Sequence, residues 1–97
     1  MSEQGVPVVI TTLHRGVFFG FLPEMPAATP DTVLLRDAQM AVYWSADTHG
    51  VLGLAAHGPG VGSRIGPPVS EISLAAVISV MAASEEAVAK WQKQIWK

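Results

Sequence analysis

The chain has 97 residues, no cysteine and only three histidines. Without a thiol, neither a disulfide framework nor thiolate catalysis is available. His14, His49 and His57 do not have the spacing of metal ligands, and no predicted helix places two of them together. We therefore expect no metal and no cofactor.

Charged residues are also scarce, at 14% of the chain, against about 25% in a typical globular domain. The net charge is −2, from six Lys and Arg and eight Asp and Glu residues. A monomer of this size normally places more charge in water, whereas a subunit of an oligomer buries part of its surface in an interface. The low charge therefore predicts self-association.

The small number of cations limits nucleic-acid binding. A long nucleic-acid backbone commonly takes about six to ten phosphate contacts. Three of the six cations lie in the C-terminal tail, which leaves Arg15, Arg36 and Arg64 in the body of the chain. One subunit cannot supply enough contacts, although a ring that repeats each arginine could.

No long hydrophobic run is present. The stretch of lowest polarity, Ile72–Ala83, has 12 residues and includes two serines, which is too short to span a bilayer. No basic segment followed by an apolar core opens the chain, so we expect no signal peptide. We expect a single soluble, cytoplasmic domain without a membrane partner, which at this length would bury about 60–65% of its unfolded surface.

Two β-patterned segments open the body of the chain. Val6–Thr12 is rich in β-branched residues, and Pro7 favours a position at the beginning of a strand. Gly16–Leu22 alternates between an aromatic face and a smaller face, and Gly20 allows a bend or a close approach by another backbone. A short turn, His14-Arg15-Gly16, joins the two predicted strands.

The middle of the chain predicts further strands. Pro23–Asp31 holds three prolines and is expected to be a stiff loop. Thr32–Trp44 is too long for one typical strand, so the interruption at Arg36-Asp37-Ala38 predicts two strands joined by a sharp bend. Ser45–Gly50 is typical of a hairpin loop, and Val51–Ala56 is predicted to return as another strand.

The glycine-rich segment His57–Pro68 separates this region from the last strand. Its four glycines and three prolines exclude regular structure. In Ile72–Ala83 the apolar residues first alternate with a period of two, which favours a strand, while the alanines favour a helix. We predict a strand and keep the helix as the alternative.

A short amphipathic helix is predicted over residues 84–97. Ser84 is a suitable N-cap, and the two acidic residues after it suit the positive end of a helix dipole. The apolar side contains Val88, Trp91 and Ile95, and the lysines gather toward the C-terminal end. Such a short helix is marginal alone, so we expect Trp91 and Trp96 to anchor it to the domain or to a neighbour.

The elements combine into a mainly β fold. We expect a small, strongly bent antiparallel β-barrel over residues 6–83, preceded by a loose arm (residues 1–5) and followed by the C-terminal helix. Exposed strand edges or the helix would join copies into a symmetric homo-oligomer.

The segments Val8–Ile10, Arg15–Leu22 and Thr32–Ala38 resemble the first half of Sm-like proteins. In that pattern a strand leads to a second strand of the form Gly, apolar, x, Gly, x, Leu, and a third strand ends in Leu-x-Asp-Ala. Ser63-Arg64-Ile65-Gly66 is loosely similar to the Arg-Gly signature of the second Sm-like motif. The resemblance implies an Sm-like β-barrel and a ring that binds single-stranded RNA.

Most of the chain also resembles a family of small, uncharacterised proteins of bacteria and their phages. The segments that carry this resemblance are Thr11–Gly20, Asp37–Trp44 and Gly62–Pro67. It implies a phage or prophage setting and brings no activity with it.

The first turn is one candidate binding site. Arg15 offers a rigid fork for a phosphate, and His14 can donate or accept a hydrogen bond near neutral pH. Alternatively, Arg15 pairs with Asp37 or Glu24, and His14 faces solvent.

Two further candidates lie later in the chain. The glycine-rich segment could surround a phosphate with backbone amides, helped by Ser63 and Arg64, or it could be a flexible connector. It lacks the Gly-Lys-Ser/Thr ending of a Walker loop and the following helix of a dinucleotide site. Tyr43 and Trp44 could stack on a base, or they could fill the core or an interface.

No nucleophile elbow, paired-carboxylate motif or His-centred triad stands out, so we do not expect an enzyme. The leading hypothesis is a homo-oligomeric binding protein that holds a small anionic, nucleotide-like ligand between subunits. In a phage it could act as a sponge for a nucleotide-derived immune signal. The alternatives are an Sm-like ring on single-stranded RNA and a structural or partner-binding phage component. The predicted ligand-binding residues are His14, Arg15, Trp44, Ser63 and Arg64.

Overall fold

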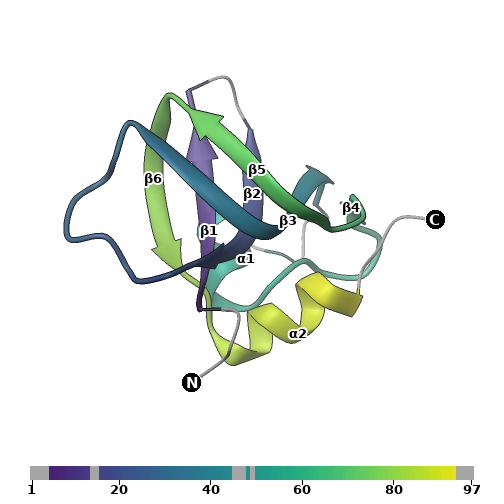
Figure 1. Cartoon of the computed structure of the whole chain (residues 1–97). Coiled ribbons are helices and arrows are strands. Elements are labelled where there is room, and N and C mark those ends of the chain that lie inside the picture. Colours follow the sequence, from purple (N-terminus) through teal and green to yellow (C-terminus); the bar gives the residue numbers. More distant parts are fainter. Residues whose placement is uncertain (1–4, 14–15, 45–47, 49, 94–97) are drawn as a thin grey trace.

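The computed structural model describes residues 5–13, 16–44, 48 and 50–93. Within this part of the chain, six strands and two helices follow one another (Figure 1). They are β1 (Val6–Thr12), β2 (Val17–Leu22), β3 (Thr32–Tyr43), α1 (Gly50–Ala56), β4 (Arg64–Ile65), β5 (Val69–Ala75), β6 (Val77–Ala82) and α2 (Glu85–Lys93). The expected mainly β fold with a C-terminal helix is confirmed.

The strands form an antiparallel sheet in the order β4-β3-β2-β1-β6, and β5 pairs with the first part of β3. β5 and β6 are consecutive in the chain, yet they join different parts of the sheet, because β6 pairs with β1. The strands that the structure describes do not pair β5 with β6. The predicted antiparallel sheet is therefore present, but it is not closed into the expected barrel.

Ala76 forms the corner between β5 and β6. Its φ of 54° lies in the left-handed region, which is uncommon for a residue with a Cβ. Leu13 N–H donates to the Ala76 carbonyl at 2.9 Å, and Val77 N–H donates to the Asp31 carbonyl at 3.1 Å. These bonds hold the corner in place and direct β6 onto β1. The strand preference for residues 72–83 is confirmed, with two strands in place of one.

β3 is a single strand of 12 residues, so the predicted division into two strands is wrong. The irregularity nevertheless lies where the sequence indicated it. Phe19 is opposite Gln39 and Phe21 is opposite Arg36, so β3 contains one residue more than β2 at this point. Asp37 lies at this irregularity and has a φ of 48°. The extra residue forms a β-bulge, which bends a strand without ending it.

The predicted strand over Val51–Ala56 is wrong, because this segment is the helix α1. A short apolar run does not show its period, so a buried helix and a buried strand cannot be distinguished from it. Gly53, Leu54 and Ala55 are buried, and Leu54 belongs to the core. The glycine-rich connector is irregular as expected, except for the two-residue strand β4.

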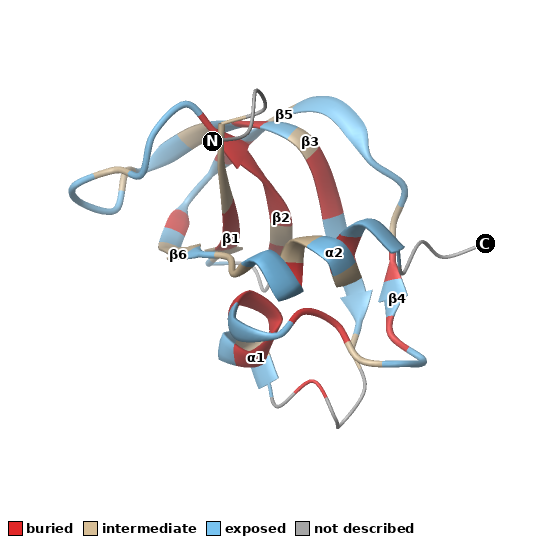
Figure 2. Cartoon of the chain, turned by 90° about the horizontal axis from the view of Figure 1, so that it is seen from below, coloured by how far each residue is buried: buried red, intermediate tan, exposed pale blue. Residues whose placement is uncertain are grey.

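The sheet has a core on each face. One core lies between the sheet and the two helices, which cover the same face (Figure 2). The other core contains residues of β1, β2, β3, β5 and β6 alone and lies inside the curve of the sheet. Val9 belongs to the first core, whereas Val8 and Ile10 belong to the second. β1 is therefore buried on both faces, which explains its continuous apolar sequence.

Gly20 permits close contact between β2 and β3. A Cβ at this position would lie 2.5 Å from Leu35 Cγ and 2.8 Å from the Arg36 carbonyl oxygen. The predicted close approach of another backbone at Gly20 is confirmed.

The start of α2 matches its prediction. The Ser84 hydroxyl accepts a hydrogen bond from Ala87 N–H at 3.0 Å, as an N-cap does, and it donates to the Ala56 carbonyl at 2.7 Å. Trp91 is fully buried against the sheet, so the expected anchor is confirmed. Ile95 and Trp96 lie outside the described residues.

Candidate functional site

The structure describes three of the five predicted ligand-binding residues, namely Trp44, Ser63 and Arg64. His14 and Arg15 lie outside the described residues. Trp44 is half-buried and packs against the core on the helix side of the sheet. Ser63 is buried, and Arg64 is exposed in β4, where it pairs with Tyr43.

Trp44 forms part of a groove of about 540 Å³, which we name the Trp44 groove. Its walls come from the end of β1, the start of β2, the start of α1, and β6. The main apolar side chains are Leu13, Val17, Trp44, Leu52, Ile78 and Met81. This volume is within the range of about 300–1,000 Å³ that is usual for small-molecule sites. Neither Ser63 nor Arg64 is among its lining residues.

A few polar groups accompany these apolar walls. The hydroxyls of Thr11 and Ser79 share a short hydrogen bond across β1 and β6, and both residues line the groove. Thr12 Oγ1 accepts a hydrogen bond from Gly16 N–H at 3.1 Å. The groove is therefore suited to an apolar group that carries a few hydrogen-bonding atoms at its edge.

The rim of the Trp44 groove is unusually apolar for a surface. Leu52, Leu13 and Ile78 are 73%, 64% and 58% exposed. Leu13 and Gly16, which both line the groove, come directly before and after His14-Arg15 in the sequence. In the sequence, the two residues of the predicted anion-binding turn are therefore flanked on both sides by a residue that lines the groove.

A second cavity, of about 260 Å³, lies between the glycine-rich segment and α2. We name it the lysine cavity. It is lined by His57, Gly58, Pro59, Gly60, Val61, Lys90 and Lys93. The sequence predicts an anion site at the glycine-rich segment with Arg64 as its cation. The cations that line this cavity are instead Lys90 and Lys93 of α2. Ser63 and Arg64 are not among its lining residues.

The loop wall of this cavity is held in place on both sides. A Cβ at Gly58 would lie 2.8 Å from Lys90 Cβ and 3.0 Å from Ala87 Cα, so the loop contacts α2 directly. Gly58 N–H donates to the Gly53 carbonyl at 3.0 Å. Gly60 N–H donates to Thr48 Oγ1 at 2.9 Å. These contacts join this part of the segment to α1, to α2 and to Thr48.

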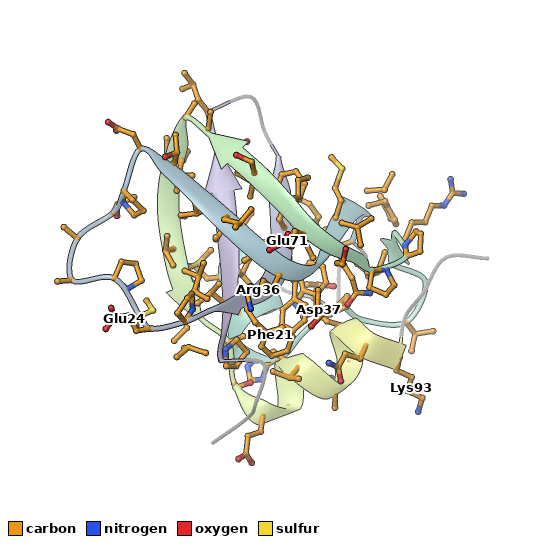
Figure 3. The ribbon with its side chains drawn as sticks, viewed as in Figure 1. Phe21, Glu24, Arg36, Asp37, Glu71 and Lys93 are labelled. Atoms are coloured by element: carbon orange, nitrogen blue, oxygen red, sulfur yellow. The ribbon has the colours of Figure 1, made fainter. Side chains whose placement is uncertain are left out.

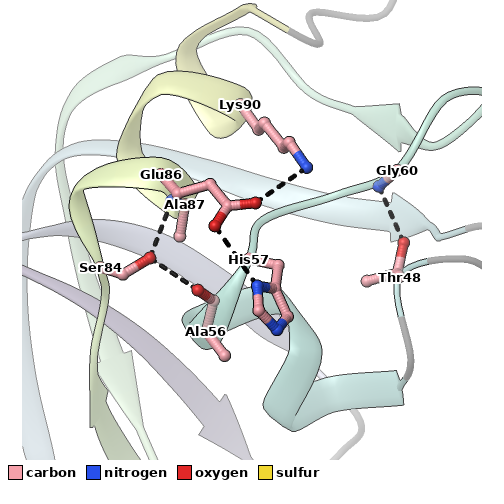
Figure 4. A network of polar contacts seen from close by, with 8 residues as sticks. All are labelled: Thr48, Ala56, His57, Gly60, Ser84, Glu86, Ala87 and Lys90. Carbon is pink, nitrogen blue, oxygen red and sulfur yellow. Dashed lines mark hydrogen bonds and ion pairs between the residues drawn. The ribbon is translucent and has the colours of Figure 1, made fainter.

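Glu86 connects the loop and α2 beside the lysine cavity (Figure 4). Its carboxylate lies 3.4 Å from His57 Nδ1 and 3.3 Å from Lys90 Nζ. The hydrogen bond with His57, followed by that with Lys90, holds the pKa of Glu86 below its ordinary value. All three side chains are about half exposed, and solvent-exposed ion pairs contribute little to stability.

An apolar groove of about 400 Å³ lies between β3 and β5, which we name the β3–β5 groove. Its lining includes Phe18, Met40, Val42, Val69 and Ile72. Beside it, Arg36 Nε and Glu71 Oε2 lie 3.7 Å apart across the paired strands (Figure 3).

Gln39 is a buried polar residue with a structural role. Its Nε2 donates to the Trp91 carbonyl at 3.1 Å and to the Gly66 carbonyl at 3.3 Å. It therefore links β3 to α2 and to the end of the connector, and its amide needs no ligand to satisfy it.

The described residues contain neither a cluster of metal-binding side chains nor a helix that could span a membrane. No group of three or more His, Cys, Asp or Glu side chains in this part of the chain is placed to hold a metal ion. The described helices are also too short to cross a membrane.

The comparisons with known proteins identify a family without an assigned activity. No curated protein and no solved structure matches the chain. A family profile described as a domain of unknown function, DUF6948, matches residues 5–91. The match extends from the residue before β1 to the buried Trp91 of α2, so it includes both cores, the Trp44 groove and most of the lysine cavity. The chain therefore belongs to the DUF6948 family, which agrees with the expected uncharacterised family.

Proposed function

We propose that the protein is a non-enzymatic binding protein for a small anionic, nucleotide-like ligand, whose flat ring lies in the Trp44 groove. The main support is the position of Trp44 in a groove of ligand size. Every base has a π face that can stack on an aromatic side chain, with a contribution of about 1–3 kcal/mol. The hydroxyls of Thr11, Thr12 and Ser79 line the same groove, and beyond the bonds that they already make each can form a further hydrogen bond to the polar edge of the ring.

The anionic part of the ligand is assigned to the first turn on the basis of sequence. Arg15 and His14 follow Leu13 and precede Gly16, which line the groove. An arginine fork is suited to a phosphate oxygen pair. Ser63 and Arg64 no longer belong to this proposed site, because the groove does not include them. In a phage, a protein of this kind would sequester a nucleotide-derived signal.

The proposal is tested by calorimetry with a panel of mononucleotides, cyclic nucleotides and ADP-ribose-type compounds. We expect one class to bind, and we expect Trp44→Leu to weaken it by about tenfold, which corresponds to the loss of one stacking contact. Because Trp44 also contacts the core, Leu52→Ser provides a second groove variant at a position that is 73% exposed. Leu34→Ser, at an exposed site that does not line the groove, is the matched control.

Two results would overturn the proposal. One is the absence of binding by every compound at high micromolar concentration. The other is binding that the groove variants leave unchanged. A single-stranded RNA oligonucleotide in the same panel tests the alternative of an RNA-binding ring, which predicts an affinity that falls steeply with salt.

Self-association is a second candidate property, and the exposed apolar surface supports it. Met40, Val42 and Val69 are 44%, 51% and 48% exposed around the β3–β5 groove. Monomeric proteins rarely expose contiguous apolar patches of large area. In the described part of the chain, β5 pairs only with β3 and β6 pairs only with β1. Each strand therefore has one edge that could pair with another copy.

Light scattering coupled to gel filtration tests this candidate. The mass of one chain is 10.3 kDa, and we expect a multiple of it for the unmodified protein. Met40→Lys should shift the mass toward the monomer, because it places a charge in the β3–β5 groove. Met25→Lys, at an exposed position in the loop between β2 and β3, should not. A monomeric mass for the unmodified protein would remove this candidate.

A further inference from the structure

The lysine cavity combines two cations with a fixed loop. Lys90 and Lys93 are three residues apart in the last turn of α2, and this spacing places them on the same side of the helix. Both line the cavity, and among the described residues its lining contains no acidic side chain. Figure 3 shows Lys93 at the end of α2. Lysine is a common phosphate-binding residue and acts as a point charge.

The loop opposite these lysines is preorganised. Its contact with α2 depends on the missing side chain of Gly58, whose φ is 87°. The Thr48 side chain, which is 1% exposed, fixes Gly60 from the other side. A binding loop that is already ordered avoids part of the entropic cost of binding. The bond from Gly58 N–H to the Gly53 carbonyl also ends α1, as glycine does at a helix C-cap, whereas the bond between Thr48 and Gly60 lies beyond the helix end.

The lysines also have an ordinary structural role, which does not account for the cavity. Cations in the last turn of a helix offset its dipole, and Lys90 pairs with Glu86 one turn earlier. Neither the dipole interaction nor the pair with Glu86 requires the glycine-rich loop to lie opposite Lys90 and Lys93. The charges of Lys90 and Lys93 together exceed that of the Glu86 carboxylate, so these three described side chains carry a net positive charge.

From these observations we propose that the lysine cavity binds a phosphoryl group, of free phosphate or of a small phosphomonoester. Its volume of about 260 Å³ is below the usual range for larger ligands. Lys90 and Lys93 would contact the phosphoryl oxygens, and the His57 ring, which also lines the cavity, would donate a hydrogen bond. Glu86 competes with the anion for Lys90 and His57. The site does not involve the Trp44 groove and does not depend on the function proposed for it.

The test is a titration of the full chain with inorganic phosphate and, separately, with ribose 5-phosphate at low ionic strength. Calorimetry measures the affinity, and amide chemical shifts locate the ligand. We expect saturable binding, with shifts concentrated at Gly58, Gly60 and Val61. Lys93→Gln should weaken it by about tenfold, and Glu86→Gln should strengthen it because it removes the competing carboxylate. Arg36→Gln changes the net charge equally on β3 and should leave the affinity unchanged.

The outcomes are distinct. Binding of both compounds identifies the phosphoryl group itself as the ligand, whereas binding of ribose 5-phosphate alone identifies a phosphomonoester. Absence of heat up to about 10 mM phosphate together with absence of binding by the sugar phosphate would overturn the proposal. An equal loss in Lys93→Gln and Arg36→Gln would also overturn it, because the response would then report net charge alone. Since neither compound has a base, failure here leaves the nucleotide proposal for the Trp44 groove unaffected.

Discussion

Trp91 of α2 stacks on Phe19 of β2, with ring centroids 5.1 Å apart and an angle of 13° between the ring planes. Phe19 in turn meets Phe21 edge to face, at 5.5 Å and 73°. The Trp91 indole N–H donates to the Leu54 carbonyl of α1 at 3.0 Å. One side chain therefore fixes α2 to the sheet by stacking and to α1 by a hydrogen bond.

We predict that Trp91→Phe lowers the free energy of unfolding by about 1–3 kcal/mol, because the buried Leu54 carbonyl loses its donor. Trp91→Ala should cost more, about 3–5 kcal/mol, because it also leaves a cavity. Urea denaturation measures both values. Val61→Ala, at a position that is 82% exposed, should change the midpoint little. Equal stability of Trp91→Phe and the unmodified protein would contradict the role of the hydrogen bond.

Gly20→Ala tests the close contact between β2 and β3. The added methyl group would overlap Leu35 and the Arg36 carbonyl, so we predict a loss of about 1–3 kcal/mol. Gly66→Ala is the matched control, because its Cβ would meet the nearest atom, the Met40 carbonyl oxygen, at an ordinary distance of 3.6 Å. Thermal unfolding of the two variants should therefore differ clearly. Similar melting temperatures would argue against the close packing.

The positive φ of Ala76, at the corner between β5 and β6, should determine which substitutions this position tolerates. Ala76→Gly should be neutral or stabilise the fold by up to about 1 kcal/mol, because glycine adopts this conformation without steric cost. Ala76→Val should destabilise it by about 1–2 kcal/mol, since a β-branched residue fits a positive φ poorly. The position is exposed, so loss of core packing does not confound the comparison.

Ala82→Val, in the exposed part of the regular strand β6, provides the control for Ala76. Valine is favourable in strands, so this substitution should not destabilise the protein. Chemical denaturation of the four proteins gives the comparison. If Ala76→Val were as stable as Ala82→Val, the left-handed corner would not be present in solution.

We expect the ion pairs of Glu86 to make the stability of the protein depend on pH. Its pKa is lowered in the folded state, first by His57 and then by Lys90. The stabilisation is therefore present above the pKa of the unfolded chain and is lost as the pH falls through the lower, folded-state pKa. We expect Glu86→Gln to melt at a lower temperature than the unmodified protein at neutral pH. The difference should disappear in acid.

The control for Glu86 is Glu85→Gln, one residue earlier in the first turn of α2. It changes the same charge near the start of the helix dipole and leaves the contacts with His57 and Lys90 in place. A pH profile of Glu85→Gln that coincides with that of Glu86→Gln would attribute the effect to the dipole and not to the network in Figure 4.

Predictions that depend on a pattern within a few neighbouring residues were confirmed at β2 and at the start of α2. The alternation in Gly16–Leu22 identified β2 (Val17–Leu22), and Ser84 identified the start of α2, because side-chain period and helix capping are local properties. α1 was predicted as a strand for the opposite reason. Its seven residues are too few to show a period, and the contact of Leu54 with Phe19 and Trp91 in one core favours the helix.

The candidate sites depend on contacts between distant parts of the chain. Trp44 was predicted from its residue type, but the groove around it also needs Val51 and Ile78, which α1 and β6 supply. The lysine cavity was missed, since Lys90 and Lys93 read as ordinary lysines at the end of a helix. The signal that could have revealed it was the glycine at position 58, which allows the loop to touch α2.

The order of residues alone was enough to specify a β-rich chain with a capped, amphipathic last helix, because backbone preference and hydrophobic period act over one or two turns of chain. Whether the curved sheet closes, which face the helices cover and which cations meet in one cavity were decided by packing. These features arise when residues such as Gly58 and Ala87, 29 positions apart in the sequence, come into contact. A local pattern does not specify such a contact, because its free energy is gained only when α1 and α2 have packed on the sheet.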